Sequence, residues 1–184
     1  INNIYLNNGD KIMSRYVVNA TYSNIPKIIN TISEETIKGK FQLCMMPILK
    51  NHNLKINQFG ITVMDGPFCS IMPKGFNKGE YILYHVEDSV LQSYEGKTRK
   101  NWNPIVNFPE NICIESCSEY FPVLNDMDFI DSWIATRIVL PDKEENDDRP
   151  TLILKHGNNI FSIFSGKLTT SIDISFELLN EISS

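Results

Sequence analysis

The feature that most constrains the fold is a strand-like segment that runs directly into a glycine turn and a helical pattern. Residues 159–164 read Asn-Ile-Phe-Ser-Ile-Phe, and residues 165–170 follow as Ser-Gly-Lys-Leu-Thr-Thr. The first turn of a helix has backbone N–H groups without intrahelical partners and carries the positive end of the helix dipole. Gly166 permits close approach of a ligand, and Thr169 and Thr170 offer capping hydroxyls. We expect this segment to hold an anion or the electron-rich edge of a ring.

An ordinary strand-to-helix turn with a threonine cap would have the same sequence, because short glycine motifs also occur by chance. The rest of the chain therefore has to decide between the two interpretations. Residues 16–21 read Tyr-Val-Val-Asn-Ala-Thr, which is typical of a buried strand that ends in small polar residues. Before them, residues 4–6 and 11–13 flank an Asn-Asn-Gly-Asp turn, which predicts a strand-turn-strand unit.

In the order of these segments, the chain resembles the second half of FAD-dependent oxidoreductases of the D-amino-acid oxidase and glycerol-3-phosphate dehydrogenase type. Two further stretches carry the resemblance, Asn19 to Ser23 and the sequence G-I-T-V-M-D-G-P-F-C-S-I-M-P from Gly60 to Pro73. The resemblance implies that Val17 to Thr21 return the chain to the flavin domain. It also implies that a C-terminal segment closes over the flavin ring, with the cofactor-binding residues Gly166, Lys167, Leu168, Thr169 and Thr170.

The fingerprint that holds the ADP half of FAD in such proteins, G-x-G-x-x-G between a strand and a helix, does not occur in this sequence. The sequence also begins at Ile1 rather than at a methionine. We interpret it as a C-terminal piece of a longer protein, made as such or left by proteolysis. The resemblance then implies that residues 1–22 are a remnant of the FAD-binding domain, residues 23–156 a substrate-binding domain, and residues 157–184 a strand and helix that return to the FAD-binding domain. FAD would belong to the full-length parent, and we expect the chain alone to be inactive.

The implied reaction is hydride transfer to flavin from a C–N or C–O bond of a small polar substrate. Arg137 lies in an otherwise apolar strand, and the resemblance implies that its guanidinium holds the substrate, since a guanidinium binds a carboxylate through two N–H groups. The alternative is an outward-facing arginine paired with Asp or Glu. Residues 148–150, Asp-Arg-Pro, resemble a hairpin near the flavin, although Ile138 stands where the family has proline after its first arginine.

His85 is the second candidate for substrate binding, because it ends an apolar strand where a neutral imidazole can shuttle a proton or bind a substrate oxygen. The alternative is a structural histidine. A different function remains open for the whole chain: a non-catalytic α+β module that binds carbohydrate or peptide, with Tyr94 and Trp102 in its binding face. A third interpretation is a fragment that only complements a separate N-terminal half.

Composition narrows the class of protein. With 184 residues, 42% of them hydrophobic, the chain can build one substantial core, or a core with a small subdomain. A net charge of −5 argues against a nucleic-acid partner, and no apolar run is long enough to span a membrane. The four cysteines lack metal-binding spacing, and Cys113 and Cys117 at i and i+4 are typical of a core. Free thiols indicate a cytoplasmic protein, and the resemblance implies a small-molecule substrate.

The pattern of apolar residues predicts an α+β fold: a mostly antiparallel or mixed β-sheet with helices packed on one face, plus terminal strands left over from a flavin-binding domain. One helix should begin at residues 23–26 and another should span 110–124. Strands are expected at residues 41–49, 60–64, 67–73, 79–86, 133–140 and 151–155, with Pro47 placing the end of its strand at an edge or bulge. Residues 94–109 should be a surface excursion, and residues 142–148 an acidic loop. The terminal strands at 16–20 and 160–164 must pair with each other, self-associate with a second copy, or remain poorly ordered.

Overall fold

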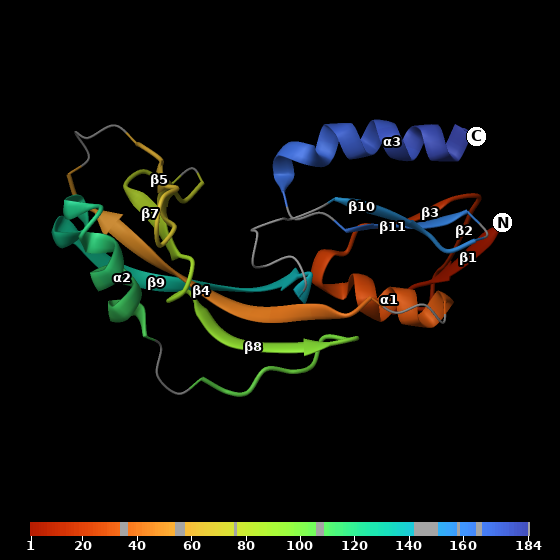
Figure 1. The fold of residues 1–184 in the computed structure, drawn as a ribbon, viewed down its shortest axis with the longest axis horizontal. Helices are drawn as coiled ribbons and strands as arrows, with labels where there is room; N and C mark the ends of the chain where they lie inside the picture. The colour runs from red at the N-terminus through yellow and green to blue at the C-terminus, as the bar shows by residue number, and fades with distance from the viewer. Residues whose placement is uncertain are drawn as a thin grey trace. The chain divides into compact units, whose positions relative to one another are not determined.

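The computed structural model describes residues 1–33, 37–53, 58–75, 77–105, 109–141, 151–157, 159–164 and 167–183 (Figure 1). The chain divides into two compact units. Unit 1 comprises Ile1–Phe41, Tyr94–Lys100 and Arg137–Ser184, and unit 2 comprises Gln42–Ser93 and Asn101–Thr136. Both consist of antiparallel or mixed sheets with helices, so the expected α+β class is confirmed.

Unit 1 begins with the predicted strand-turn-strand unit. β1 (Asn2–Tyr5) and β2 (Lys11–Ser14) form an antiparallel hairpin in which Asn2 is opposite Ser14. Gly9 in the connecting turn has a φ of +89°, a conformation that glycine adopts without the steric cost that a Cβ imposes. The turn chemistry seen in the sequence therefore fixes this hairpin.

A three-stranded sheet of unit 1 has the order β10, β11, β3. β10 (Leu152–Lys155) and β11 (Ile160–Phe164) are antiparallel, whereas β11 and β3 (Val17–Asn19) are parallel, with Ile160 opposite Val17 and Ser162 opposite Asn19. The two terminal strands of the prediction thus pair with each other, which was one of the three outcomes left open.

Two 3-10 turns and two α-helices of unit 1 are described together with this sheet. A 3-10 turn, η1 (Tyr22–Asn24), leads into α1 (Ile25–Ile32), which begins with Pro26 in its first turn as predicted. Ile25 and Ile29 are buried, whereas Ile32, at the end of the helix, is 37% exposed. A second 3-10 turn, η4 (Leu168–Thr170), leads into α3 (Ser171–Ser183). α3 lies beside β10 (Figure 1). Lys155 of β10 and Glu181 of α3 form an ion pair at 3.6 Å.

Unit 2 is built on an antiparallel meander. β5 (Ile61–Val63), β6 (Cys69–Pro73) and β7 (Glu80–His85) follow one another in sequence and in the sheet, as the spacing of turn residues predicts. β7 then pairs with β4 (Gly39–Asn51), and β4 also pairs with β8 (Val90–Gly96) and β9 (Met127–Val139). Because β4 is 13 residues long, it has room for three partners along its length.

Two sequence-based expectations are wrong in this region. Pro47 does not end its strand: its side chain is fully buried within β4, which continues to Asn51, and the pairing of β4 with β7 begins at Ile48, opposite Ile82. Pro47 removes one possible ladder hydrogen bond, but burial in the sheet core keeps the strand continuous. Residues 94–96 are not part of a surface excursion either, because they are the end of β8. The ring of Tyr94 stacks on Phe41, with centroids 5.3 Å apart, and this contact favours the strand.

The core of unit 2 lies between its sheet and α2 (Glu110–Ser118). The helix expected over 110–124 ends at Ser118 and is followed by a 3-10 turn, η2 (Pro122–Asp126). Cys113 and Cys117 are fully buried on the inner face of α2, so their interpretation as core residues is confirmed. The core cluster also contains Leu49, Cys69, Ile71, Tyr81, Leu83, Phe121, Leu124 and Met127. The acidic stretch 142–148 lies outside the described residues. In the part of the chain that is described, no helix has the length and hydropathy needed to cross a membrane.

Candidate functional site

The predicted cofactor segment follows the carboxyl end of a parallel strand pair. Because β3 and β11 run in the same direction, the residues after Asn19 and those after Phe164 leave the sheet at the same edge, which is the one formed by the carboxyl ends of the two strands. In sheets with parallel strands, ligands bind in the crevice outside this edge. Lys167 to Thr170 follow β11 at this edge, and their role in binding a cofactor stays a prediction. Gly166, the first residue of the predicted set, lies outside the described residues.

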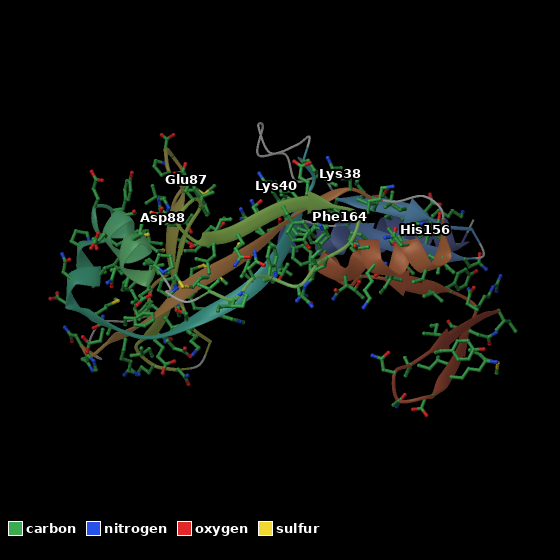
Figure 2. All side chains as sticks on the ribbon, turned by 90° about the horizontal axis from the view of Figure 1, so that it is seen from below. Lys38, Lys40, Glu87, Asp88, His156 and Phe164 are labelled. Atoms are coloured by element: carbon green, nitrogen blue, oxygen red, sulfur yellow. The ribbon has the colours of Figure 1, made fainter. Side chains whose placement is uncertain are left out.

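A buried polar network joins the two parallel strands just before this edge. Asn19 Nδ2 donates to Ser162 Oγ at 3.1 Å and to the carbonyl of Ile25 at 3.4 Å, while Asn19 Oδ1 accepts from the Thr21 hydroxyl at 2.7 Å. His156 Nε2 lies 2.9 Å from Ser162 Oγ (Figure 2). Asn19 and Ser162 are 4% and 0% exposed. The network holds the backbone in place where the chain leaves β3 at this edge of the sheet.

The turn itself is held by its threonine. Thr170 Oγ1 donates to the carbonyl of Lys167 at 2.9 Å and lies 2.8 Å from the hydroxyl of Thr151, next to the start of β10. Lys167 and Leu168 are exposed, and Leu168 has 89% of its surface accessible. At such a turn, the leucine side chain can pack on the flat face of a ring while the lysine ammonium contacts a polar atom at the edge of the same ring.

The helix start beyond this turn carries its own negative charge. Asp173 lies in the first turn of α3, the position where the helix dipole stabilises a carboxylate. A bound anion would meet repulsion from Asp173 as well as attraction from the helix. Of the two ligands expected from the sequence, this arrangement favours the edge of an electron-rich ring over a free anion.

Arg137 occupies a different part of unit 1. It lies near the end of β9, is half-buried, and precedes Ile138, which is 1% exposed. The Asp-Arg-Pro stretch at 148–150, which would form the rest of the expected hairpin, lies outside the described residues. The role of Arg137 as a carboxylate anchor stays a prediction.

His85 is at the end of β7 in unit 2 and is 5% exposed. Its Nδ1 accepts from the backbone N–H of Asp88 at 3.1 Å and lies 3.1 Å from the Asp88 carboxylate. Asp88, labelled in Figure 2, lies in the turn between β7 and β8. The backbone N–H of His85 donates to Ser89 Oγ at 3.0 Å. These contacts favour a structural histidine that holds a tight turn, and its role in substrate binding stays a prediction.

The thiols of unit 2 form a buried cluster of their own. Burial raises the pKa of Cys69, and a hydrogen bond between the thiols of Cys117 and Cys113 raises the pKa of Cys117 and lowers that of Cys113. Ser89 Oγ lies 3.8 Å from Cys113 Sγ. Among the residues described, no group of three or more His, Cys, Asp or Glu side chains has an arrangement that could hold a metal ion. The cluster is consistent with packing.

The aromatic residues of the alternative binding face make contacts within the chain. Tyr94 stacks on Phe41, and the indole N–H of Trp102 donates to Thr136 Oγ1 at 2.9 Å. These contacts occupy one face of Tyr94 and the polar atom of Trp102, so they do not favour a carbohydrate- or peptide-binding face.

Sequence reasoning missed the polar network at Asn19, Ser162 and His156. A signal for it existed, since Ser162 is the one polar residue inside Ile-Phe-Ser-Ile-Phe and Asn19 interrupts an apolar strand. Both residues occur where a buried side chain was expected. A polar residue at such a position usually has a partner, and the partner here comes from the parallel strand.

The fold is shared by several oxidoreductases of known structure. The L-proline dehydrogenase from P. horikoshii matches 89% of this chain with a TM-score of 0.60 and 16% identity. The glycerol-3-phosphate dehydrogenase from Bacillus halodurans, solved in complex with FAD, matches 95% with a TM-score of 0.61 and 15% identity. The glycine oxidase from Geobacillus kaustophilus matches 85% with a TM-score of 0.55 and 12% identity. At these identities the likeness establishes the fold, and it confirms at that level the resemblance seen in the sequence.

The chain spans only part of each of these proteins: 41% of the L-proline dehydrogenase, 33% of the glycerol-3-phosphate dehydrogenase and 37% of the glycine oxidase. No protein-family model and no curated protein sequence matches it. The structural likeness is therefore to a portion of larger oxidoreductases.

Proposed function

We propose that this chain is the C-terminal part of an FAD-dependent oxidoreductase that oxidises a C–N or C–O bond of a small polar substrate. Residues 1–22 and 157–184 would complete a flavin-binding domain, and residues 23–156 would form the substrate-binding part. The observation that carries the proposal is the parallel pairing of β3 with β11, which sets the turn Lys167 to Thr170 at the carboxyl edge of the sheet. The fold shared with a dehydrogenase solved in complex with FAD supports it.

FAD would supply the hydride acceptor, and the chain would supply its position and surroundings. Lys167 and Leu168 would contact the flavin, and Thr170 would keep their turn in place through its bonds to Lys167 and Thr151. Arg137 would hold a substrate carboxylate through two parallel hydrogen bonds, which orient the substrate as well as bind it. His85 is the second candidate for substrate contact, although its bonds in the β7–β8 turn favour a supporting role.

The surface of unit 1 supports the view that further protein covers it. Ile172, Phe176 and Leu179 follow one another at i, i+4 and i+7 on α3 and are 67%, 64% and 56% exposed. Side chains at this spacing lie on one face of a helix. Among the described strands, β3 pairs only with β11, so its other edge is open for strand pairing. Both features suit a chain whose dinucleotide-binding half packs against α3 and extends the sheet at β3.

A flavin titration of the 184-residue chain tests the proposal. Because the sequence lacks the G-x-G-x-x-G turn that binds ADP, the contacts left in this chain should be to the flavin ring. We expect FMN to bind as well as FAD, with quenching of the fluorescence of Trp102 and Trp133, and ADP not to compete. Gly166→Val should abolish binding.

Gly60→Val is the matched control for this titration. The nearest atom to a Cβ at Gly60 is 3.8 Å away, so the added side chain meets no clash at its first carbon. Equal loss of binding in both variants would indicate a general effect on folding. Saturable binding that survives Gly166→Val, or no binding of either flavin, would contradict a flavin contact at this turn.

A further inference from the structure

A cavity in unit 2 has the chemistry of a small ligand site. Its volume is about 330 Å³, and its lining comes from the first residue of α2 and the middle of β9: Glu110, Phe129, Ile130, Asp131, Ser132 and Ile134. Cavities that hold small molecules have volumes from roughly 300 Å³ upward, with mostly apolar walls and a few polar groups. The cavity on β9 fits this description at its lower limit.

Two oxygen atoms of this lining are buried without a partner. Among the described residues, neither Glu110 Oε2 nor Ser132 Oγ accepts or donates a hydrogen bond, and both atoms are shielded from solvent. A buried polar atom without a partner costs about 1–3 kcal/mol, so such atoms are rare in native structures and call for an explanation. Two of them lining the same cavity are explained together by a ligand that bonds to both.

The carboxylates in the cavity lining favour a cationic ligand. Glu110 is the first residue of α2 and brings one carboxyl group to the cavity. Asp131 adds a second carboxylate, of which Oδ1 accepts the backbone N–H of Ser132 at 2.8 Å. Among the described residues, no Lys, Arg or His lines the cavity. A cation with several N–H donors satisfies this set of acceptors.

The apolar side chains in the cavity lining favour a ligand that has an aliphatic part. Phe129, Ile130 and Ile134 are 42%, 47% and 43% exposed, which is a high exposure for large apolar side chains within one strand. An aliphatic chain that contacts these side chains removes apolar surface from water while its charged end reaches the oxygens.

We propose that this cavity binds a small primary amine, with the ammonium group on Glu110 and Ser132 and its aliphatic stem against Phe129, Ile130 and Ile134. The ammonium donates one hydrogen bond to Glu110 Oε2 and one to Ser132 Oγ, and Asp131 adds charge at the rim. The site does not rest on the proposed flavin function, because every residue in it belongs to unit 2 and none is in the predicted cofactor segment.

The test is a titration of the full chain, labelled with ¹³C at the isoleucine δ-methyl groups, with three ligands of matched shape: n-pentylammonium, n-pentanol and pentanoate. We expect n-pentylammonium to shift the signals of Ile130 and Ile134 saturably, with a Kd on the order of 1–10 mM for so small a ligand. n-Pentanol should bind at least about tenfold more weakly, and pentanoate should not bind, because it brings negative charge to Glu110 and Asp131.

Variants assign the binding to the two oxygens. Glu110→Gln keeps the shape and removes the charge, and should raise the Kd at least about tenfold, whereas Ser132→Ala should raise it about threefold. Glu115→Gln is the control, because Glu115 is an exposed glutamate of the same helix that does not line the cavity. The unliganded methyl spectrum of each variant shows whether its fold is retained.

Three results would overturn the proposal. They are equal affinity for n-pentanol and n-pentylammonium, an unchanged Kd in Glu110→Gln with a retained fold, and the absence of saturable shifts at Ile130 and Ile134. Shifts at other isoleucines alone would likewise place the amine elsewhere.

Discussion

Asn19 on β3 donates a hydrogen bond to Ser162 on β11, with 3.1 Å between Nδ2 and Oγ, and the two residues are directly opposite each other in the parallel pair. This contact joins segments 143 positions apart in the sequence. Because Asn19 donates to the hydroxyl, the hydrogen of Ser162 is left for His156 Nε2 at 2.9 Å. The two ends of the chain are therefore connected by a buried polar network as well as by the strand ladder.

Removing Asn19 should destabilise the protein strongly. Asn19→Ala leaves Ser162 and the carbonyl of Ile25 without their donor in a site where Asn19 itself is 4% exposed, so the free energy of unfolding should fall by about 2–3 kcal/mol. Urea denaturation followed by circular dichroism measures this change. The control is Asn30→Ala, which removes a bond to the carbonyl of Lys97 that is exposed and should cost less than about 1 kcal/mol. Equal losses in the two variants would show that the network adds nothing beyond an ordinary surface bond.

The turn after β3 contains a strained residue. Tyr22 has a φ of +52°, a left-handed conformation that a Cβ makes unfavourable by roughly 1–2 kcal/mol. Tyr22→Gly and Tyr22→Ala both remove the ring, but only glycine relieves the backbone. We expect the glycine variant to be the more stable of the two by about 1 kcal/mol, as measured by chemical denaturation.

Val18 is the control position for this comparison, because its backbone is extended rather than left-handed. It lies within β3 in an extended strand and is 41% exposed, so Val18→Ala should be more stable than Val18→Gly. If alanine were also the better residue at position 22, the left-handed backbone there would not be a source of strain.

Acid should remove a stabilising contribution from Glu80. A hydrogen bond from Asn77 at 2.9 Å, followed by Lys74 at 3.4 Å, lowers the pKa of Glu80 below its ordinary value of 4.5. A carboxyl whose pKa is lower in the folded than in the unfolded state stabilises the fold at pH values above 4.5, and this stabilisation is lost as the pH falls through the folded-state pKa.

The difference in unfolding free energy between the wild type and Glu80→Gln should therefore be largest near pH 7 and shrink below pH 4.5. Urea titrations at several pH values measure it. Asn77→Ala removes the largest cause of the lowered pKa, so in that background the difference at pH 7 should be smaller and its loss should be complete at a higher pH. A difference that stays constant from pH 7 to pH 3 would show that the Glu80 carboxylate is not stabilised in its charged form.

Local chemistry explains which parts of the fold were predictable. The β1–β2 hairpin, the β5–β6–β7 meander and the start of α1 follow from residues close in sequence: Gly9 and Gly66 adopt the positive φ values that their turns need, and the ring of Pro26 fixes φ in the first turn of α1. Tertiary contacts decided the rest. β8 depends on partners such as Phe41, which stacks on Tyr94, and Pro47 stays within β4 because that strand is buried. No local pattern contains this information.

In the candidate site, too, local sequence predicts some features and tertiary contacts determine the others. The turn at Lys167 to Thr170 was predictable, because a strand, a glycine and a helix follow one another in the sequence. Its place beside β3 depends on a parallel pairing between residues more than 140 positions apart, which no short pattern contains. For His85, the sequence showed a histidine at a strand end, but its burial and its contact with Asp88 are properties of the folded turn.

A close contact between Gly39 and Ile138 allows the packing of unit 1 to be tested. A Cβ placed on Gly39 would clash with Cδ1 of Ile138 and lie 2.7 Å from its Cγ1, and Ile138 is 1% exposed, so it has little room to move. Gly39→Ala should therefore lower the free energy of unfolding by about 1–3 kcal/mol.

Ile138→Ala alone should cost about 2–5 kcal/mol through the cavity that it leaves. In the double variant the new methyl group enters that space, so its cost should be less than the sum of the two single costs by at least about 1 kcal/mol. Equilibrium unfolding of the four proteins in this cycle gives the coupling energy. Additive costs would mean that the backbone at Gly39 moves away from Ile138 and that the strand ends are less tightly packed than the contact indicates.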